Sequence, residues 1–361
     1  MAQSYRIGSL FGIGIELHWT FILLLLACLL LSTYLFLLIA LLFVCVLIHE
    51  VAHSITCKRN NVRVKKIILL PIGGASIIDD AKLSPEVEFN VAISGPLMSI
   101  FLGCLFGVLV IFAPLGLPTM ILQFLFIMNI FLGVFNLMPA FPTDGGRVFR
   151  SYLERRHDEY TATMLTVKAS KYTLAIFLVG SLAYLVFTGA SLFNIEFILL
   201  WDLLIVFYLY GGAMAEKQTA ELKRDAKGLS VRGAVTKHFA LVGPGTSVRD
   251  LYGLAAKSGE HLFITKLPEG YAYVNLLSTR RRGNPTSARD LSARIPSMPV
   301  GTGLVDALQM MGSAEASMGA VTDRGRLVGI VTLSSLQTFL SLHVLNKKGN
   351  TTDKPSAPMT A

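Results

Sequence analysis

The motif HEVAH at residues 49–53 directly follows an apolar run, residues 34–48, that is typical of a membrane-spanning helix. Ionisable side chains inside a bilayer cost roughly 2.5–3.5 kcal/mol each, and they usually mark a functional site. Residues four apart lie on one face of a helix, so His49 and His53 can offer imidazole nitrogens to one metal ion while Glu50 reaches an attacking water. Two imidazoles, one carboxylate and an open position are typical of catalytic zinc. The pattern therefore predicts a zinc site at membrane depth.

The composition is that of an integral membrane protein. The chain has 361 residues, of which 53% are hydrophobic and 15% charged, and its mean hydropathy is +0.60. A soluble domain of this length needs fewer apolar residues for its core, and a helix needs about 20 of them to cross a bilayer. Apolar segments near or somewhat below this length lie at residues 17–31, 34–55, 87–112, 120–138, 174–187 and 195–213. We expect a multi-pass α-helical membrane protein with about six transmembrane helices.

The net charge of +9 indicates how these spans are oriented. Basic residues follow the second and fourth spans: Lys58, Arg59, Arg63, Lys65, Lys66, Arg147, Arg150, Arg155 and Arg156. Residues 113–119 and 188–194, which follow the third and fifth spans, contain no Lys or Arg. Because basic loops stay in the cytosol, we expect both termini there. The basic residues flank spans without interleaved aromatic residues, so we expect no nucleic-acid partner.

A zinc site needs a third ligand, and Asp144 is the candidate at comparable depth. It lies in the segment NLMPAFPTDGG, residues 136–146, where Pro139 and Pro142 interrupt the fourth span and two glycines follow the carboxylate. Non-helical backbone at membrane depth is tolerated only where it is buried in protein or lines a wet cavity. The alternative is a proline-rich turn capped by an aspartate at the membrane surface. If the segment is instead buried beside the metal, Asn136 also faces inward. Its amide could then donate a hydrogen bond to a carbonyl oxygen or a developing oxyanion.

These motifs together resemble those of the site-2 protease family of intramembrane zinc metalloproteases. The resemblance rests on the HEVAH motif, the element from Asn136 to Gly145 and the stretch SGPL at residues 94–97, and it covers about residues 8–212. It implies that His49, His53 and Asp144 bind zinc and that Glu50 is the general base. It also implies that Asn136 positions the substrate or stabilises the oxyanion. The family often has Asn shortly after Gly-Pro-Leu, where this chain has Met98-Ser99, so no role is transferred there.

Residues 64–78 are expected to form a small membrane-associated β-hairpin or sheet, because they are rich in β-branched residues and interrupted by Pro71, Gly73 and Gly74. An intramembrane protease must hold its substrate as an unwound strand, and an exposed sheet edge can do so by strand addition. Glycines let a peptide lie close to the backbone, so Gly73 and Gly74 are candidate substrate-binding residues. The alternative is a cytosolic hairpin that only packs against the helices.

The second half of the chain reads as soluble. Residues 1–214 form the expected transmembrane domain, and residues 215–227 a charged helical linker. The expected order of strand, helix, strand, strand and helix in residues 298–342 resembles a cystathionine-β-synthase (CBS) module, and a weaker copy lies at residues 239–276. We therefore expect a paired α/β CBS domain with modules at 228–283 and 284–345, followed by a polar disordered tail at 346–361.

CBS pairs commonly bind adenine nucleotides, and the resemblance implies an Asp for the ribose three residues beyond a Thr or Ser. Ser335 stands at that offset from Thr332, and Asn275 and Ser278 replace the expected Thr and Asp in the first copy. We expect ATP or AMP binding to be weak or absent. A structural role, or a homodimer formed through the pair, is at least as good an expectation as nucleotide binding.

The predicted function is hydrolysis of peptide bonds within or near transmembrane segments of membrane proteins, which is regulated intramembrane proteolysis. The expected location is the cell membrane of a prokaryote, with the CBS pair regulating or dimerising the enzyme. A membrane metal transporter or sensor would use the same ligands, but it would not need Glu50 or the segment from Asn136 to Asp144. A catalytically dead scaffold would lack one of the metal ligands, and none is missing from this sequence.

Overall fold

The computed structural model describes residues 4–71, 73–78, 83–188, 192–259, 262–274, 276 and 286–352. The chain divides into two compact units, Met1–Ala220 and Glu221–Ala361. The first holds the apolar helices and the HEVAH motif, and the second holds the region predicted to be soluble.

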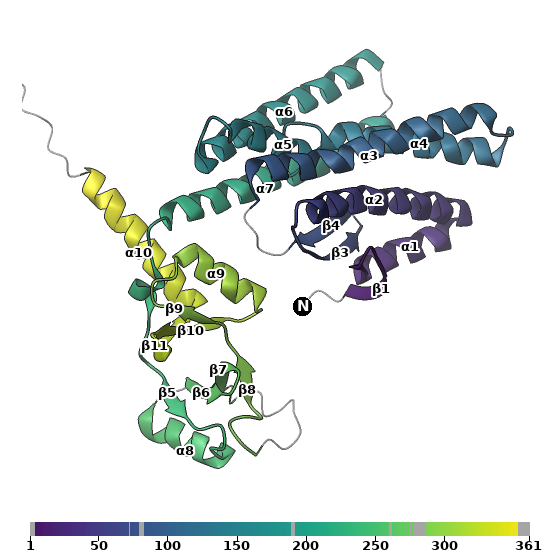
Figure 1. Ribbon diagram of the computed structural model, residues 1–361. Coiled ribbons are helices and arrows are strands. Elements are labelled where there is room, and N and C mark those ends of the chain that lie inside the picture. Colours follow the sequence, from purple (N-terminus) through teal and green to yellow (C-terminus); the bar gives the residue numbers. More distant parts are fainter. Residues whose placement is uncertain are drawn as a thin grey trace, which may run out of the picture. The chain divides into compact units, whose positions relative to one another are not determined.

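The first unit is built on seven helices among its described residues (Figure 1). They are α1 (Trp19–Leu31), α2 (Thr33–Arg59), α3 (Pro85–Phe112), α4 (Leu117–Asn136), α5 (Asp144–Leu153), α6 (Glu159–Thr188) and α7 (Leu192–Asp225). Five of these, α2, α3, α4, α6 and α7, are long and apolar enough to cross a membrane. The fifth predicted span began at residue 174, whereas α6 begins at Glu159, so half of this helix precedes the segment that hydropathy marked.

The first predicted span is shorter in the structure than in the prediction. Helix α1 has 13 residues, or about 20 Å at 1.5 Å per residue, which is less than the roughly 30 Å hydrocarbon core. Leu17 and His18 belong to a strand, and the His18 side chain caps α1 by accepting a hydrogen bond from the Thr20 amide. The described residues therefore contain five candidate spans and one short apolar helix, where the sequence predicted six spans.

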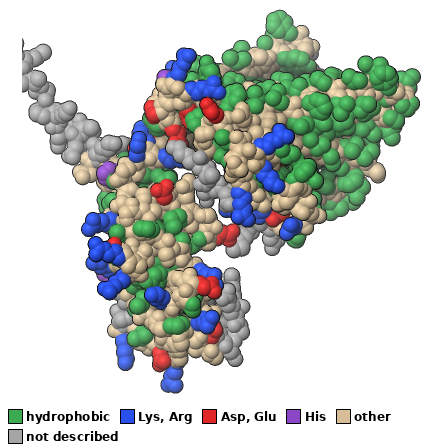
Figure 2. Space-filling view, in the orientation of Figure 1, with side chains coloured by type: hydrophobic (Ala, Val, Ile, Leu, Met, Phe, Trp, Pro, Cys, Tyr) green, Lys and Arg blue, Asp and Glu red, His purple; other side chains and the backbone are tan. Residues whose placement is uncertain are grey.

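The outer surface of the helices is strongly apolar. Figure 2 shows hydrophobic side chains covering α3 and α4 almost continuously, while Lys and Arg gather at the other end of this unit. Phe187 of α6 is 88% exposed and Phe207 of α7 is 79% exposed. Exposing apolar side chains of this size to water is unfavourable, so the helices need a lipid environment.

A four-stranded sheet packs against α1 and α2. The strands are β1 (Ser4–Leu10), β2 (Ile13–His18), β3 (Val64–Leu70) and β4 (Gly73–Ile78), in the order β1-β2-β3-β4. The hairpin predicted in residues 64–78 is formed by β3 and β4, and Ile72 lies outside the described residues. The N-terminal hairpin β1–β2, which we did not predict, pairs in parallel with β3 through β2. Ile13 and Ile67 of the sheet pack with Val51 of α2. In the strand order, β4 is at one edge of the sheet.

The second unit contains two sheets. Its strands and helices follow the predicted order, except that a strand at Ser292–Arg294 was not predicted. The first part comprises β5 (Ala240–Val242), α8 (Val248–Ser258), β6 (Phe263–Leu267), β7 (Gly270–Val274) and β8 (Ser292–Arg294). The second comprises β9 (Ser297–Pro299), α9 (Leu304–Ser313), β10 (Met318–Asp323), β11 (Arg326–Thr332) and α10 (Leu333–Thr352). Their sheets have the orders β5-β6-β7-β8 and β11-β10-β9.

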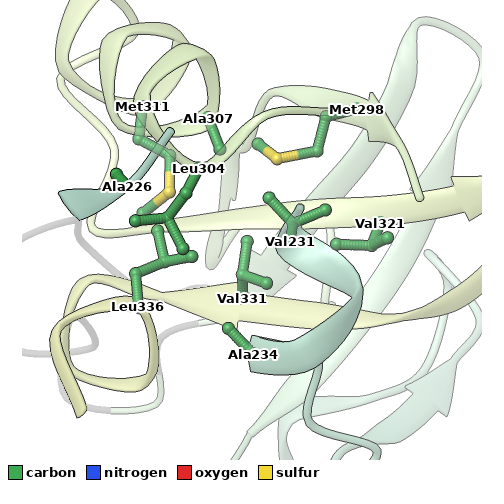
Figure 3. Close-up of a cluster of buried hydrophobic side chains, with 10 residues drawn as sticks. All are labelled: Ala226, Val231, Ala234, Met298, Leu304, Ala307, Met311, Val321, Val331 and Leu336. Carbon is green, nitrogen blue, oxygen red and sulfur yellow. The ribbon is translucent and has the colours of Figure 1, made fainter. Parts of the chain in front are cut away.

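The segment that enters this unit packs on its second part. Ala226 follows α7, and Val231 and Ala234 lie in the short 3₁₀ helix η1 (Val231–Ala234). Figure 3 shows these three side chains in one core with Leu304 and Leu336 of α9 and α10. The Thr236 amide also donates to Ile330 O. Residues 226–236 thus complete the core of the second part, whereas the sequence placed residues from 228 onward in the first module.

Helix α10 differs from the prediction at its end. It continues to Thr352, so residues 346–352, expected in a disordered tail, are helical. No proline interrupts this segment, since the next one is Pro355. Residues 353–361, and Asn275 and Ser278 of the first module, lie outside the described residues.

Candidate metal centre

His49, His53 and Asp144 meet at one point between α2 and α5. Both histidines are buried, and Asp144 is the first residue of α5. His49 Nε2 and His53 Nε2 are 3.1 Å apart, and each lies 3.2 Å from Asp144 Oδ2. Ligands that bind zinc tetrahedrally at about 2.0–2.1 Å are about 3.3 Å from one another. The three atoms therefore form a triangle of the size that zinc requires, and a fourth position is left for water or substrate.

The other nitrogen of each imidazole has its own partner. His53 Nδ1 lies 2.7 Å from Val91 O, and His49 Nδ1 lies 2.8 Å from Ser99 Oγ, both on α3. A carbonyl oxygen only accepts, so His53 Nδ1 carries the proton and Nε2 keeps its lone pair for a metal. Such partners fix the tautomer and the ring orientation of metal-binding histidines.

Helix α3 approaches the imidazoles at a glycine. A Cβ atom built on Gly95 would lie 2.2 Å from His53 Nε2 and 2.6 Å from His49 Nε2. Any larger residue would thus occupy the space between the candidate ligand atoms. Gly95 is the glycine of the SGPL stretch, and the position requires glycine because a side chain would overlap both imidazoles.

The Glu50 side chain lies against strand β4. Its Oε2 atom accepts a hydrogen bond of 2.7 Å from Ser76 Oγ. A Cβ atom built on Gly74 would lie 2.3 Å from Glu50 Cγ, so only glycine allows the strand to pass this close. The carboxylate that follows His49 is therefore held by the hairpin predicted to bind substrate.

Helix α5, which begins with Asp144, is held by ion pairs between partly buried side chains. The Arg150 guanidinium forms ion pairs with Glu88 of α3, Glu154 of α5 and Glu216 of α7. Burial alone would lower the pKa of Arg150, but Glu88, Glu216 and Glu154 raise it above its ordinary value. The side chain therefore stays charged and connects α5 to two spans.

The structure brings together most of the predicted site residues. His49, His53 and Asp144 converge, and Glu50 and Gly74 lie in contact beside them. Gly73 has a positive φ of 141° and open space around its Cα, so its geometry serves the turn into β4. Asn136 is half-buried at the end of α4, and none of its hydrogen bonds reaches the cluster within the described part of the chain.

Sequence reasoning missed Ser76 and Ser99 as partners of Glu50 and His49. Ser99 lies four residues after Gly95 and therefore on the same face of α3, a spacing that could have indicated its role. Ser76 is two residues from Gly74, on the same side of β4. That signal was available only once Gly74 was known to face Glu50.

Comparison with known proteins identifies the family. The model of "Peptidase family M50" matches residues 37–119 and 112–181, which include all three candidate ligands. The protein "Zinc metalloprotease MJ0392" of Methanocaldococcus jannaschii is 30% identical over 96% of this chain and 99% of that relative. The chain belongs to peptidase family M50. It is a zinc metalloprotease of the site-2 protease type, as the sequence predicted.

Two further similar proteins extend the comparison. "Putative zinc metalloprotease Rip3" of Mycobacterium tuberculosis is 26% identical over 83% of this chain and 79% of its own length. The solved structure titled "Site-2 Protease from Methanocaldococcus jannaschii" is 34% identical and covers 60% of this chain and 95% of that chain, with a TM-score of 0.44. The relatives are prokaryotic, and with the apolar helices they identify this M50 protease as a prokaryotic membrane protein.

Proposed function

We propose that His49, His53 and Asp144 hold the catalytic zinc, and that the enzyme hydrolyses peptide bonds within or near transmembrane segments of its substrates. The triangle of Nε2, Nε2 and Oδ2 atoms, with sides of 3.1 and 3.2 Å, is the observation that supports this proposal. Zinc, when bound, polarises the scissile carbonyl and lowers the pKa of water to about 7. The chain's own residues must supply the remaining parts of the reaction.

Glu50 is the proposed general base. It follows His49 directly, and a carboxylate beside a metal-binding histidine can take a proton from the attacking water and pass it to the leaving amine. The hydrogen bond from Ser76 holds one carboxylate oxygen and limits rotation of the side chain. This orientation supports Glu50 as a base, because proton transfer requires hydrogen-bond distance and alignment.

Asn136 is the proposed oxyanion donor. It ends α4 eight residues before Asp144, on the same irregular segment. Its amide would donate to the carbonyl oxygen only when a substrate strand is present. An oxyanion donor of this kind is typically worth 10²–10³ in rate.

The substrate strand would add to the free edge of β4. This strand is the last in the sheet order, and Gly74 brings its backbone against Glu50. A peptide paired with β4 would run past the base while its own backbone groups are satisfied by the strand. Gly73 and Gly74 would keep side chains out of this passage.

Both termini are proposed to be cytosolic. β2 leads into α1, β3 follows α2, and the two strands pair in parallel from Gly14↔Lys66 to Leu17↔Leu69. The α1–α2 hairpin therefore starts and ends on one side of the membrane, beside the basic residues after α2. Helices α3 with α4 and α6 with α7 add two further returns to that side, which is cytosolic by the positive-inside rule.

The second unit is proposed to be a CBS pair that regulates or dimerises the protease. At the position of the expected ribose-binding Asp, the Ser335 hydroxyl accepts from the Thr332 amide at 2.9 Å, and the Ser335 amide donates to Thr332 Oγ1 at 3.1 Å. Thr332 and Ser335 thus form a capping box at the start of α10. We expect titration calorimetry of the full-length protein with ATP or AMP to show little heat, and micromolar binding would overturn this part of the proposal.

The function is tested by reconstituting the full-length protein in liposomes with a model single-span substrate. The wild type should cleave it, a zinc chelator should stop cleavage, and zinc should restore it. Glu50→Gln should bind zinc and fail to cleave, since the base is lost while the ligands remain. A metal transporter with the same ligands would instead leave the substrate intact and move zinc across the liposome membrane.

A further inference from the structure

The first half of α6 carries three buried hydroxyl side chains on one face. Thr163, Thr166 and Ser170 are 2%, 0% and 3% exposed. The two threonines donate only along their own helix, from Thr163 Oγ1 to Glu159 O at 2.8 Å and from Thr166 Oγ1 to Ala162 O at 2.9 Å. Ser170 donates to Thr166 O in the same way, and it also accepts a hydrogen bond of 2.9 Å from the Phe141 amide. Ser170 is therefore the one of these three that links α6 to another segment.

Phe141 is held from several sides in the loop that leads to Asp144. It is fully buried, in one cluster with Val167 of α6 and Ala213 of α7. The Arg150 guanidinium carbon lies 5.7 Å from its ring centroid. A buried amide N–H with no partner is costly, and bulk water does not reach the fully buried Phe141 to replace Ser170. The Ser170 hydroxyl thus satisfies a donor that the loop itself does not satisfy.

The loop between Phe141 and Asp144 is tightly packed, so a movement at one of these residues is passed on to the other. Thr143 Oγ1 donates to Met138 O at 2.8 Å and to Ala140 O at 2.7 Å. A Cβ atom built on Gly145 would lie 2.3 Å from Met138 O, so the start of α5 presses directly on the loop. A shift of the Phe141 backbone would therefore move Asp144 as well.

We propose that Ser170 is a positioning residue for Asp144. Its hydroxyl holds the Phe141 amide, and through the packed loop it keeps Asp144 Oδ2 at 3.2 Å from both histidine nitrogens. Ser170 touches neither metal nor substrate, and its effect passes through the third ligand. The inference rests on the proposed role of Asp144 as a zinc ligand.

The test compares zinc affinity in full-length variants by competition with a chromophoric chelator, together with kcat and KM for a model transmembrane substrate. Ser170→Ala removes the acceptor, and Ser170→Thr restores a hydroxyl. Thr166→Val is the matched control, since it removes an equally buried hydroxyl of α6 that bonds only within its helix. Asp144→Ala is measured beside them.

Ser170→Ala should bind zinc about tenfold or more weakly, as loss of an orienting partner does at metal sites. Its kcat should fall with little change in KM, and Ser170→Thr should recover both. Wild-type zinc affinity in Ser170→Ala, or an equal loss in Thr166→Val, would overturn the inference. If Ser170→Ala does not fold, Ser170→Cys, which keeps the volume with a weaker acceptor, takes its place with the same expectations. Undiminished zinc affinity in Asp144→Ala would instead overturn the proposed ligand set.

Discussion

Ser76 Oγ donates a 2.7 Å hydrogen bond to Glu50 Oε2, which joins the edge strand of the sheet to the carboxylate of the HEVAH motif. The two residues are 26 positions apart in the chain. Strand β4 would therefore have two roles in the proposed reaction. Its free edge would pair with the substrate, and its Ser76 side chain would orient the general base. Binding and proton transfer would thus depend on the same short strand.

Ser76→Ala should lower kcat about tenfold while zinc content stays at the wild-type level. A hydrogen bond to a charged group is worth about 1.5–3 kcal/mol, and its loss lets the Glu50 side chain rotate away from its working orientation. Steady-state cleavage and metal analysis check this expectation. Ser76→Thr keeps a hydroxyl and should retain most of the activity, whereas equal losses in both variants would assign Ser76 to packing.

Gly95→Ala should abolish zinc binding, because the added methyl carbon would lie 2.2 Å from His53 Nε2 and 2.6 Å from His49 Nε2. Gly180→Ala is the matched control, since Gly180 lies in α6 with no atom within 4 Å of the added carbon. Zinc content and thermal unfolding of the purified variants separate the two effects. Zinc bound to Gly95→Ala at the wild-type affinity would show that α3 does not enclose the ligands as described.

Substrate should cross-link to β4 and not to the opposite sheet edge. Ile77 of β4 is 37% exposed and Tyr5 of β1 is 54% exposed, so both positions accept a reactive cysteine. Cys104 is the exposed native cysteine among the four in the chain and is replaced by Ser in both variants. A substrate with a cysteine beside its scissile bond should form a disulfide with Ile77→Cys. Equal cross-linking to Tyr5→Cys would argue against strand addition at β4.

The helices and the candidate ligands could be predicted because their signals are local. The HEVAH spacing places two imidazoles on one helical face, and an aspartate between prolines and glycines is unusual at the end of a span. Long apolar runs likewise identify spans without knowledge of their neighbours. The order of strands and helices in the second unit followed from short alternating segments and turns.

The parts that could not be predicted depend on distant contacts. Strand β2 ends at His18 and shortens α1 because residues 14–17 pair with residues 66–69, and no local pattern shows that pairing. Ser76 and Ser99 became visible only when β4 and α3 were placed beside α2. In the same way, Ala226 and Val231 precede the first module in the chain but fill the core of the second.

The central claim is that His49, His53 and Asp144 are the zinc ligands and that Glu50 is not. Zinc content of purified full-length protein, measured by elemental analysis after removal of loosely bound metal, tests it most directly. We predict about one zinc per chain in the wild type and in Glu50→Gln, and far less in Asp144→Ala, because two histidines leave an incomplete site. One zinc per chain in Asp144→Ala would contradict the account.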